Sequence, residues 1–80
     1  MAAAPLTAYP NPCTTELLVP ADPRPRTAEV LDLTGRRVLR QELTGGAERI
    51  GTAALPSGMY VLRVLAGGEK VGRQVRFSKQ

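Results

Sequence analysis

The 80-residue sequence has no histidine, no tryptophan, one cysteine and one phenylalanine. Histidine is the commonest general base and metal ligand, so its absence excludes a serine-type catalytic triad and histidine-based metal sites. A single cysteine cannot form an internal disulfide or a cysteine-rich zinc site. The composition therefore predicts a domain that is not an enzyme and that holds no metal and no cofactor.

The one cysteine, Cys13, has two interpretations. A free cysteine commonly behaves as a small hydrophobic residue, and we interpret Cys13 as such a residue, half-buried. The alternative is a disulfide that joins two chains. One cysteine does not settle which redox compartment the protein occupies.

Long apolar runs are missing as well. No segment approaches the ~18 consecutive apolar residues that a membrane-spanning helix needs, so we expect no membrane span. Residues 1–8 lack the charged start and the long apolar stretch of a secretory signal peptide. We expect residues 1–8 to be a linker and residues 9–80 to form one domain, since a chain of this length makes a single small domain.

Basic residues outnumber acidic ones by 11 to 7, and nine of the basic residues are arginine. The arginines are interleaved with acids and form no basic tail. The net charge of +4 permits attraction to nucleic acid or anionic polysaccharide. Sheets that bind single strands, however, combine basic residues with aromatic side chains that stack on bases. Only three residues here are aromatic, so we expect solvated arginines on outer strand faces and no nucleic-acid partner.

The clearest structural element is the stretch at residues 55–65, which reads Leu-Pro-Ser-Gly-Met-Tyr-Val-Leu-Arg-Val-Leu. Pro56 and Gly58 predict a tight turn, and a strand follows directly. The alternation of side chains places Tyr60, Leu62 and Val64 on one face of that strand. Because aromatic residues are so few, we expect Tyr60 to be a main anchor of the core.

Turn-forming residues divide the rest of the chain into short strands. Gly35 predicts a hairpin turn in which Asp32 hydrogen-bonds the local backbone rather than acting as a catalytic acid. A helix over residues 27–43 is the alternative, but Gly35 and the β-branched residues there argue against it. Besides the central strand, the expected strands cover residues 14–19, 27–33, 36–43, 48–53 and 70–78, with a further short strand near Tyr9 or Ala21.

This assignment of strands also predicts where individual side chains lie. Leu33 is expected to close the second strand, and Val38 to be the clearest inward residue of the third. Val75 and Phe77 are expected to share one face of the last strand. Six or seven short strands with turn signals about every ten residues are typical of an all-β antiparallel sandwich.

Three segments and the last strand carry a family resemblance. They read Tyr9-Pro10-Asn11-Pro12, then residues 30–38 around Gly35, then residues 55–64 with Pro56, Gly58 and Tyr60, and finally a basic strand that ends at Lys79-Gln80. Together they resemble the type A C-terminal sorting domain of the type IX secretion system, over about residues 9–80. The resemblance implies an immunoglobulin-like β-sandwich of seven strands.

The resemblance also implies a role in protein transport. Such domains end exported proteins of certain bacteria with two membranes, and the attached N-terminal cargo crosses the inner membrane by a separate signal. The outer-membrane translocon then recognises the folded sorting domain. A surface sortase cuts upstream of it, here within residues 2–8, and the cargo is released or joined to the cell surface.

The resemblance assigns residues to two roles. Pro56, Gly58 and Tyr60 match the family's Pro-x-Gly-x-Tyr signature, and Gly35 matches its hairpin glycine. We expect these residues to serve mainly the turns and the core. The last strand is the candidate for recognition, because an edge strand can add to a partner's sheet. The candidate residues there are Lys70, Val75, Arg76, Phe77 and Lys79.

Two questions stay open. Arg76 and Lys79 are equally well explained as partner contacts and as solvated charges, and the ending Ser78-Lys79-Gln80 is more polar than the apolar-basic pair on which many members finish. The second concerns function. The alternative to a sorting domain is a small carbohydrate-binding or adhesive module, for which Tyr9 is the one plausible aromatic platform.

Overall fold

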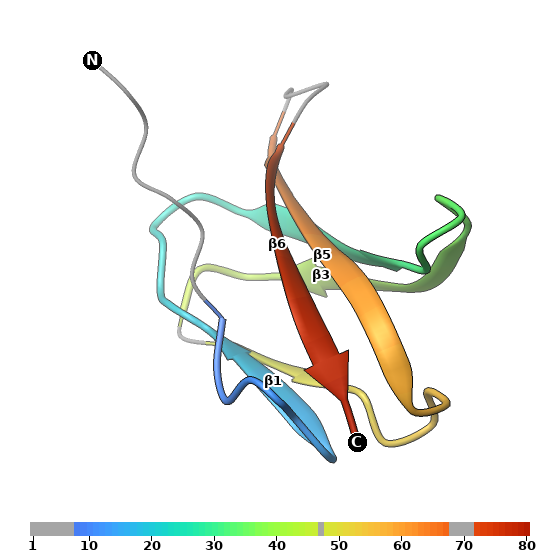
Figure 1. Ribbon diagram of the computed structural model, residues 1–80. Helices are drawn as coiled ribbons and strands as arrows, with labels where there is room; N and C mark the ends of the chain where they lie inside the picture. The colour runs from blue at the N-terminus through green and yellow to red at the C-terminus, as the bar shows by residue number, and fades with distance from the viewer. Residues whose placement is uncertain (1–7, 47, 68–71) are drawn as a thin grey trace.

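The computed structural model describes residues 8–46, 48–67 and 72–80, and in these ranges the chain is all-β. No helix there is long and apolar enough to cross a membrane. The strands form two antiparallel sheets, ordered β1-β4 and β3-β2-β5-β6 (Figure 1). The strands are β1 (Glu16–Val19), β2 (Arg26–Leu31), β3 (Arg37–Leu43), β4 (Glu48–Gly51), β5 (Gly58–Ala66) and β6 (Arg73–Lys79).

The two sheets enclose one hydrophobic core. Leu17 and Ile50 of the small sheet are buried in the same cluster as Val30, Leu62 and Phe77 of the large sheet. The prediction of an antiparallel sandwich is thereby confirmed, and the arrangement is compatible with an immunoglobulin-like fold. The strand count is six rather than seven, because the expected extra strand near Tyr9 is a single bridge to Leu18.

Strand β5 is one of the two inner strands of the larger sheet. It pairs with β2 on one side and with β6 on the other. The predicted alternation is confirmed, because Tyr60, Leu62 and Val64 are buried while the side chains between them face outward. Burying one large aliphatic side chain contributes roughly 1.5–3 kcal/mol, so the inward face of β5 is a large part of the fold's stability.

The Pro-x-Gly-x-Tyr signature has a local physical explanation. The hydroxyl of Tyr60 donates a hydrogen bond of 2.6 Å to the carbonyl oxygen of Pro56, so the side chain closes the turn that leads into its own strand. Gly58 begins β5 with a φ of 155°, in the region that favours glycine. The ring of Tyr60 stacks on Phe77 of β6, with centroids 5.7 Å apart. The prediction of Tyr60 as a core anchor is confirmed.

The turn between β2 and β3 depends on Asp32 and Gly35. One carboxylate oxygen of Asp32 accepts hydrogen bonds from the backbone N–H groups of Thr34 and Arg36, at 2.9 and 3.0 Å. These bonds and that of the Thr34 hydroxyl, which contributes most, hold the pKa of Asp32 below its usual value. Gly35 has a φ of 89°, which residues with a side chain rarely adopt.

The same turn corrects one expectation. Strand β2 ends at Leu31, because the hydrogen bonds of Asp32 already close the turn at the next residue. Leu33 therefore does not close the strand, and it lies 61% exposed on the turn.

A β-bulge shapes the start of β3. Val30 pairs with Leu39, whereas Leu31 pairs with Arg37, so one extra residue lies on β3. Val38 and Leu39 both pack against the core although they are neighbours in sequence. Val38 is only half-buried, and Leu43 is the fully buried residue of β3 instead.

The strand ends differ elsewhere by a few residues. Strand β1 begins at Glu16 and β4 ends at Gly51, each shorter than the sequence predicts. Strand β6 begins at Arg73 and extends one residue further than expected, to Lys79. Residues 70 and 71, which we expected to open this strand, lie outside the described residues.

Arg26 departs from the expectation that the arginines are solvated. Its residue surface is only 7% exposed, because it faces inward with Ala28 and Val30 and is the first residue of β2. One guanidinium nitrogen, Nη2, donates to the carbonyl oxygen of Pro20 at 3.0 Å. The buried Nε has no hydrogen-bond partner in the described structure. An incompletely satisfied buried charge weakens a fold.

Replacing Tyr60 by phenylalanine tests the side chain that closes the turn. The Tyr60→Phe variant keeps the ring stacked on Phe77 but loses the hydrogen bond to Pro56. We expect the free energy of unfolding to fall by about 1 kcal/mol, measured by urea denaturation at an unchanged m-value. Tyr9→Phe is the matched control, because Tyr9 is 52% exposed. Equal effects of the two changes would contradict this role of the Tyr60 hydroxyl.

Arg26 offers a second test. Arg26→Met keeps an unbranched side chain of similar length and removes the buried charge, so we expect it to be neutral or stabilising by about 1 kcal/mol. Arg26→Ala also removes the packing of the aliphatic stem and is expected to destabilise. Thermal unfolding of both variants distinguishes charge from packing. A loss as large in Arg26→Met as in Arg26→Ala would show that the guanidinium itself is needed.

Candidate docking surface

Strand β6 is an edge strand of the larger sheet, since β5 is its only partner among the strands that the structure describes (Figure 1). Its side chains alternate between two faces. Val75, Phe77 and Lys79 face the core, and Phe77 is 1% exposed. Gln74 and Arg76 face outward and are exposed. The prediction that Val75 and Phe77 share one face of the last strand is confirmed.

Lys79 is neither a solvated charge nor an open partner contact. It is 8% exposed, and its ammonium group donates a hydrogen bond of 3.1 Å to the carbonyl oxygen of Leu55. This bond offsets part of the cost of burying a charge. It also ties the end of β6 to the loop that precedes β5. The sequence pattern did not reveal this, because lysine is rarely buried.

The Tyr-Pro-Asn-Pro motif covers one part of the β6 edge. The backbone of Cys13 donates to Ser78 and accepts from Gln80, both at 2.9 Å. The side chain of Asn11 accepts a bond of 2.9 Å from the N–H of Ser78, and its amide nitrogen lies 3.5 Å from the carbonyl oxygen of Arg76. We call residues 11–13 the 11–13 segment. It runs parallel to β6 and substitutes for a neighbouring strand at the end of the chain.

The other residues of this motif hold the 11–13 segment in place. Tyr9 exchanges two backbone hydrogen bonds with Leu18 of β1, at 2.6 and 3.1 Å. Pro10 and Pro12 are exposed on either side of Asn11. Cys13 is fully buried, more so than expected, and its sulfur lies 3.6 Å from the hydroxyl of Thr52. The folded domain therefore does not offer its thiol to another chain.

The remaining part of the β6 edge is open. The bonds to Ser78 and Arg76 show that the even-numbered residues of β6 direct their backbone groups away from β5. The backbone groups of Gln74 and the N–H of Arg76 have no partner among the described residues. An edge of this kind can accept a strand from another protein.

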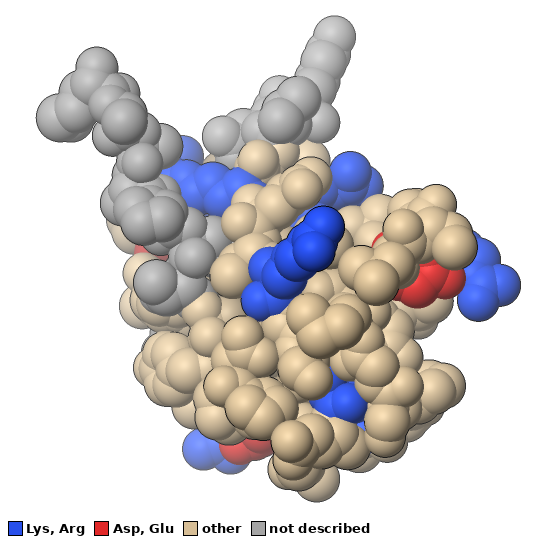
Figure 2. All heavy atoms as spheres, in the orientation of Figure 1, with Lys and Arg blue, Asp and Glu red and all other residues tan. Residues whose placement is uncertain are grey.

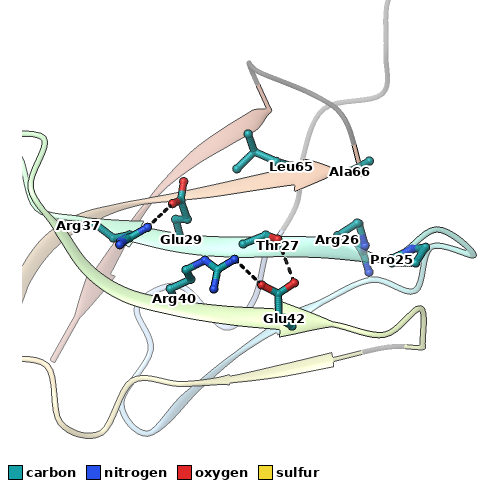
Figure 3. A pocket seen from close by; sticks show the side chains of 10 residues that line it. Pro25, Arg26, Thr27, Glu29, Arg37, Arg40, Glu42, Leu65 and Ala66 are labelled. Carbon is teal, nitrogen blue, oxygen red and sulfur yellow. Dashed lines mark hydrogen bonds and ion pairs between the residues drawn. The ribbon is translucent and has the colours of Figure 1, made fainter.

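Ion pairs neutralise most of the outer face of the larger sheet. The carboxylate of Glu29 lies 2.7 Å from Arg63 and 3.1 Å from Arg37, and these hydrogen bonds, that of Arg63 first, hold the pKa of Glu29 below its usual value. Glu42 pairs with Arg40 and accepts a hydrogen bond from Thr27. All of these side chains except that of Arg63 line an open groove of about 460 Å³ (Figure 3).

The groove in Figure 3 offers little chemistry to a ligand. Glu29 and Glu42 are each paired with an arginine, as the dashed lines in the figure mark, and the guanidinium of Arg26 is largely buried. No group of three histidine, cysteine, aspartate or glutamate side chains in the described part of the chain is placed to hold a metal ion.

Arg76 differs from the paired arginines. No described acidic side chain lies within ion-pair distance of it, although it projects from the exposed face of β6. The space-filling view shows basic atoms over β6, whereas the acidic atoms visible there lie away from this strand (Figure 2). As far as the structure describes the chain, the closing strand therefore combines an open stretch of backbone edge with a positive charge that has no acidic partner.

Two of the three motifs meet at β6. The Tyr-Pro-Asn-Pro motif contacts β6 through the hydrogen bond between Asn11 and Ser78. The Pro-x-Gly-x-Tyr motif contacts it through the stacked rings of Tyr60 and Phe77. Gly35 lies apart, in the turn between β2 and β3. Lys70 lies outside the described residues. Tyr9 is exposed, but it is the one exposed aromatic side chain in the described ranges and so makes no extended stacking platform.

Comparison with known proteins agrees with the motifs. The family model for the secretion system C-terminal sorting domain matches residues 7–76. No curated protein gives a match to the chain. The family match covers all three motifs and most of the last strand, leaving residues 77–80 outside it. Because it spans well over half of the sequence, the chain belongs to the family of secretion system C-terminal sorting domains of the type IX pathway.

Proposed function

We propose that residues 9–80 form the unit that directs an attached N-terminal cargo through the outer-membrane translocon of the type IX system. In this proposal residues 1–8 link the cargo to the domain. The cargo reaches the periplasm by its own signal, and a surface sortase cuts upstream of Tyr9. The domain itself carries out no catalysis and acts by docking. Family membership supports a sorting role, and the geometry of β6 supports the docking mode.

The docking mode is supported by the different positions of the side chains of β6, some of which are buried in the fold while others are exposed. Its inward residues Phe77 and Lys79 are buried in the folded domain. A translocon that reads the folded domain meets the outward side chains of Gln74 and Arg76 and the open backbone between them. Of the candidates in the terminal segment, we therefore assign contact to Arg76. Val75, Phe77 and Lys79 hold the strand in place, and Lys70 stays a candidate contact.

The 11–13 segment limits where a partner strand can pair. It occupies the backbone of Ser78 and the carbonyl oxygen of Arg76, so the open part of the edge covers residues 73–76. A strand of about four residues fits there, with main-chain hydrogen bonds supplying affinity and neighbouring side chains supplying specificity. The same segment brings the start of the domain, where the cargo is joined, beside the closing strand.

Fusion to a reporter tests the sorting function. Residues 9–80 are joined to the C-terminus of a periplasmic reporter protein in a host that has a type IX translocon. We expect the reporter on the cell surface or in the medium, measured by fractionation. A known sorting domain is the positive control. Retention of the reporter in the periplasm while the control is exported would contradict the proposal.

A proline tests the docking edge. Deleting residues 76–80 is a poor test, because it removes Phe77 and Lys79 from the fold. Gln74→Pro instead removes one outward N–H, which no ladder bond of β5 uses, and proline is tolerated at such edge positions. We expect the melting temperature to change by only about 2–3 °C. Export of the reporter is expected to fall about tenfold, as for the loss of roughly 1.4 kcal/mol of binding.

Gln74→Ala is the matched control for this experiment. It removes the same side chain but keeps the backbone N–H, so the loss of export in Gln74→Pro beyond that in Gln74→Ala measures the backbone hydrogen bond. If Gln74→Pro folds and is exported as well as Gln74→Ala, strand addition at β6 is not the docking mode.

A further inference from the structure

A second groove lies on the outer face of the larger sheet, between the turn that follows β2 and the closing strand β6. We infer that it binds a short acidic segment of a partner protein, in which an aliphatic or aromatic side chain lies next to a carboxylate. Its volume is about 300 Å³. We call it the β2–β6 groove. It is lined by Leu31, Asp32, Leu33, Gly35, Val61, Arg63, Gln74 and Arg76.

The strand register gives the shape of the β2–β6 groove. Leu31, Val61 and Arg76 lie side by side across three strands, since Val61 pairs with each of the other two. Val61 and Arg63 line the groove from β5, Leu33 lines it from the turn after β2, and β6 contributes Gln74 and Arg76. Strands β2 and β6 are two strand spacings apart, roughly 10 Å, a width that suits one extended chain.

The apolar part of the groove is more exposed to solvent than the fold itself requires. Leu33 is 61% exposed, although the hydrogen bonds of Asp32 hold its turn in a defined conformation. Leu31 and Val61 beside it are half-buried. A large aliphatic side chain on a defined turn, in the same groove as two half-buried apolar residues, offers an apolar ligand a contact surface that requires no further ordering of the protein. This favours an aliphatic or aromatic side chain as one part of the ligand.

The charged part of the groove favours a carboxylate. Asp32 is the acid of the groove, but its oxygens already accept bonds from Thr34 and Arg36. Arg63 is bound to Glu29. Arg76 has no acidic partner among the described residues, so its guanidinium is the group left to pair with a ligand. An arginine fork binds a carboxylate through two parallel hydrogen bonds.

These features select a peptide over other ligands. The groove has no aromatic side chain on which a base could stack, which disfavours single-stranded nucleic acid. One unpaired cation beside an apolar wall fits a peptide that carries one acidic and one apolar side chain. The inference depends on the proposed function only for the identity of the partner, which would be a component of the export machinery.

Peptide titration of the intact 80-residue chain tests the groove. The probe is the blocked peptide acetyl-Gly-Asp-Phe-Asp-Gly-amide, observed by NMR chemical-shift changes of the protein amides. We expect shifts at residues of the β2–β6 groove. Arg76→Gln and Leu33→Ser are each expected to weaken binding about fivefold, the effect of losing one exposed ion pair or one partly buried apolar contact. Both residues are exposed, so the fold is expected to tolerate the changes.

Two control variants match these changes outside the groove. Arg73→Gln removes an exposed arginine from the same strand, and Met59→Gln removes an exposed apolar side chain from β5. Both are expected to bind the peptide like the parent. Two control peptides replace both aspartates by lysine or the phenylalanine by alanine, and both are expected to bind more weakly.

The outcomes separate this inference from the sorting function. Absence of binding, equal binding by the lysine peptide, or equal losses in the groove and control variants would overturn the inference, whatever the reporter fusion shows. If the reporter fusion is not exported but the peptide binds with the expected variant pattern, the groove stands as a peptide site and the sorting proposal fails alone.

Discussion

The structure depends on the contact between the inward faces of β5 and β6. Tyr60 stacks on Phe77 across these two strands, and the Tyr60 hydroxyl fixes the turn that starts β5. Lys79 adds a third tie, from the end of β6 to Leu55. Because these contacts use the side chains of one face of β6, the opposite face is left to the solvent, together with the part of the backbone edge that the 11–13 segment does not cover. The same contacts that close the fold therefore define the surface open to a partner.

The motifs of the chain are best understood through this closing strand. The turn formed by Pro56, Gly58 and Tyr60 starts β5, with which β6 pairs. Asn11 and Cys13 cover the end of the β6 edge, which would otherwise be unpaired. Residues at the two ends of the sequence thus share one structural unit. Partial covering is a common way to limit unwanted pairing at a sheet edge. Here it leaves a short open edge beside Arg76, which suits selective docking better than general aggregation.

Local features of the fold could be predicted from the sequence, and long-range ones could not. The alternation in β5 and the turn chemistry of Asp32 and Gly35 act over a few residues, so the pattern itself contains them. The hydrogen bond between Asn11 and Ser78 joins positions 67 residues apart, for which periodicity carries no signal. The burial of Lys79 contradicts the usual preference of its residue type, and the position of Leu33 depended on a turn that closes two residues early.

In the folded domain, the backbone of β6 is hydrogen-bonded along one side and open along part of the other. Amide hydrogen exchange of the intact chain, measured by NMR, distinguishes the two sides residue by residue. We predict slow exchange at Val75 and Phe77, whose N–H groups face β5, together with fast exchange at Gln74 and Arg76, whose N–H groups lie on the outer edge. Uniformly fast exchange along β6, or protection at Gln74 equal to that at Val75, would contradict it.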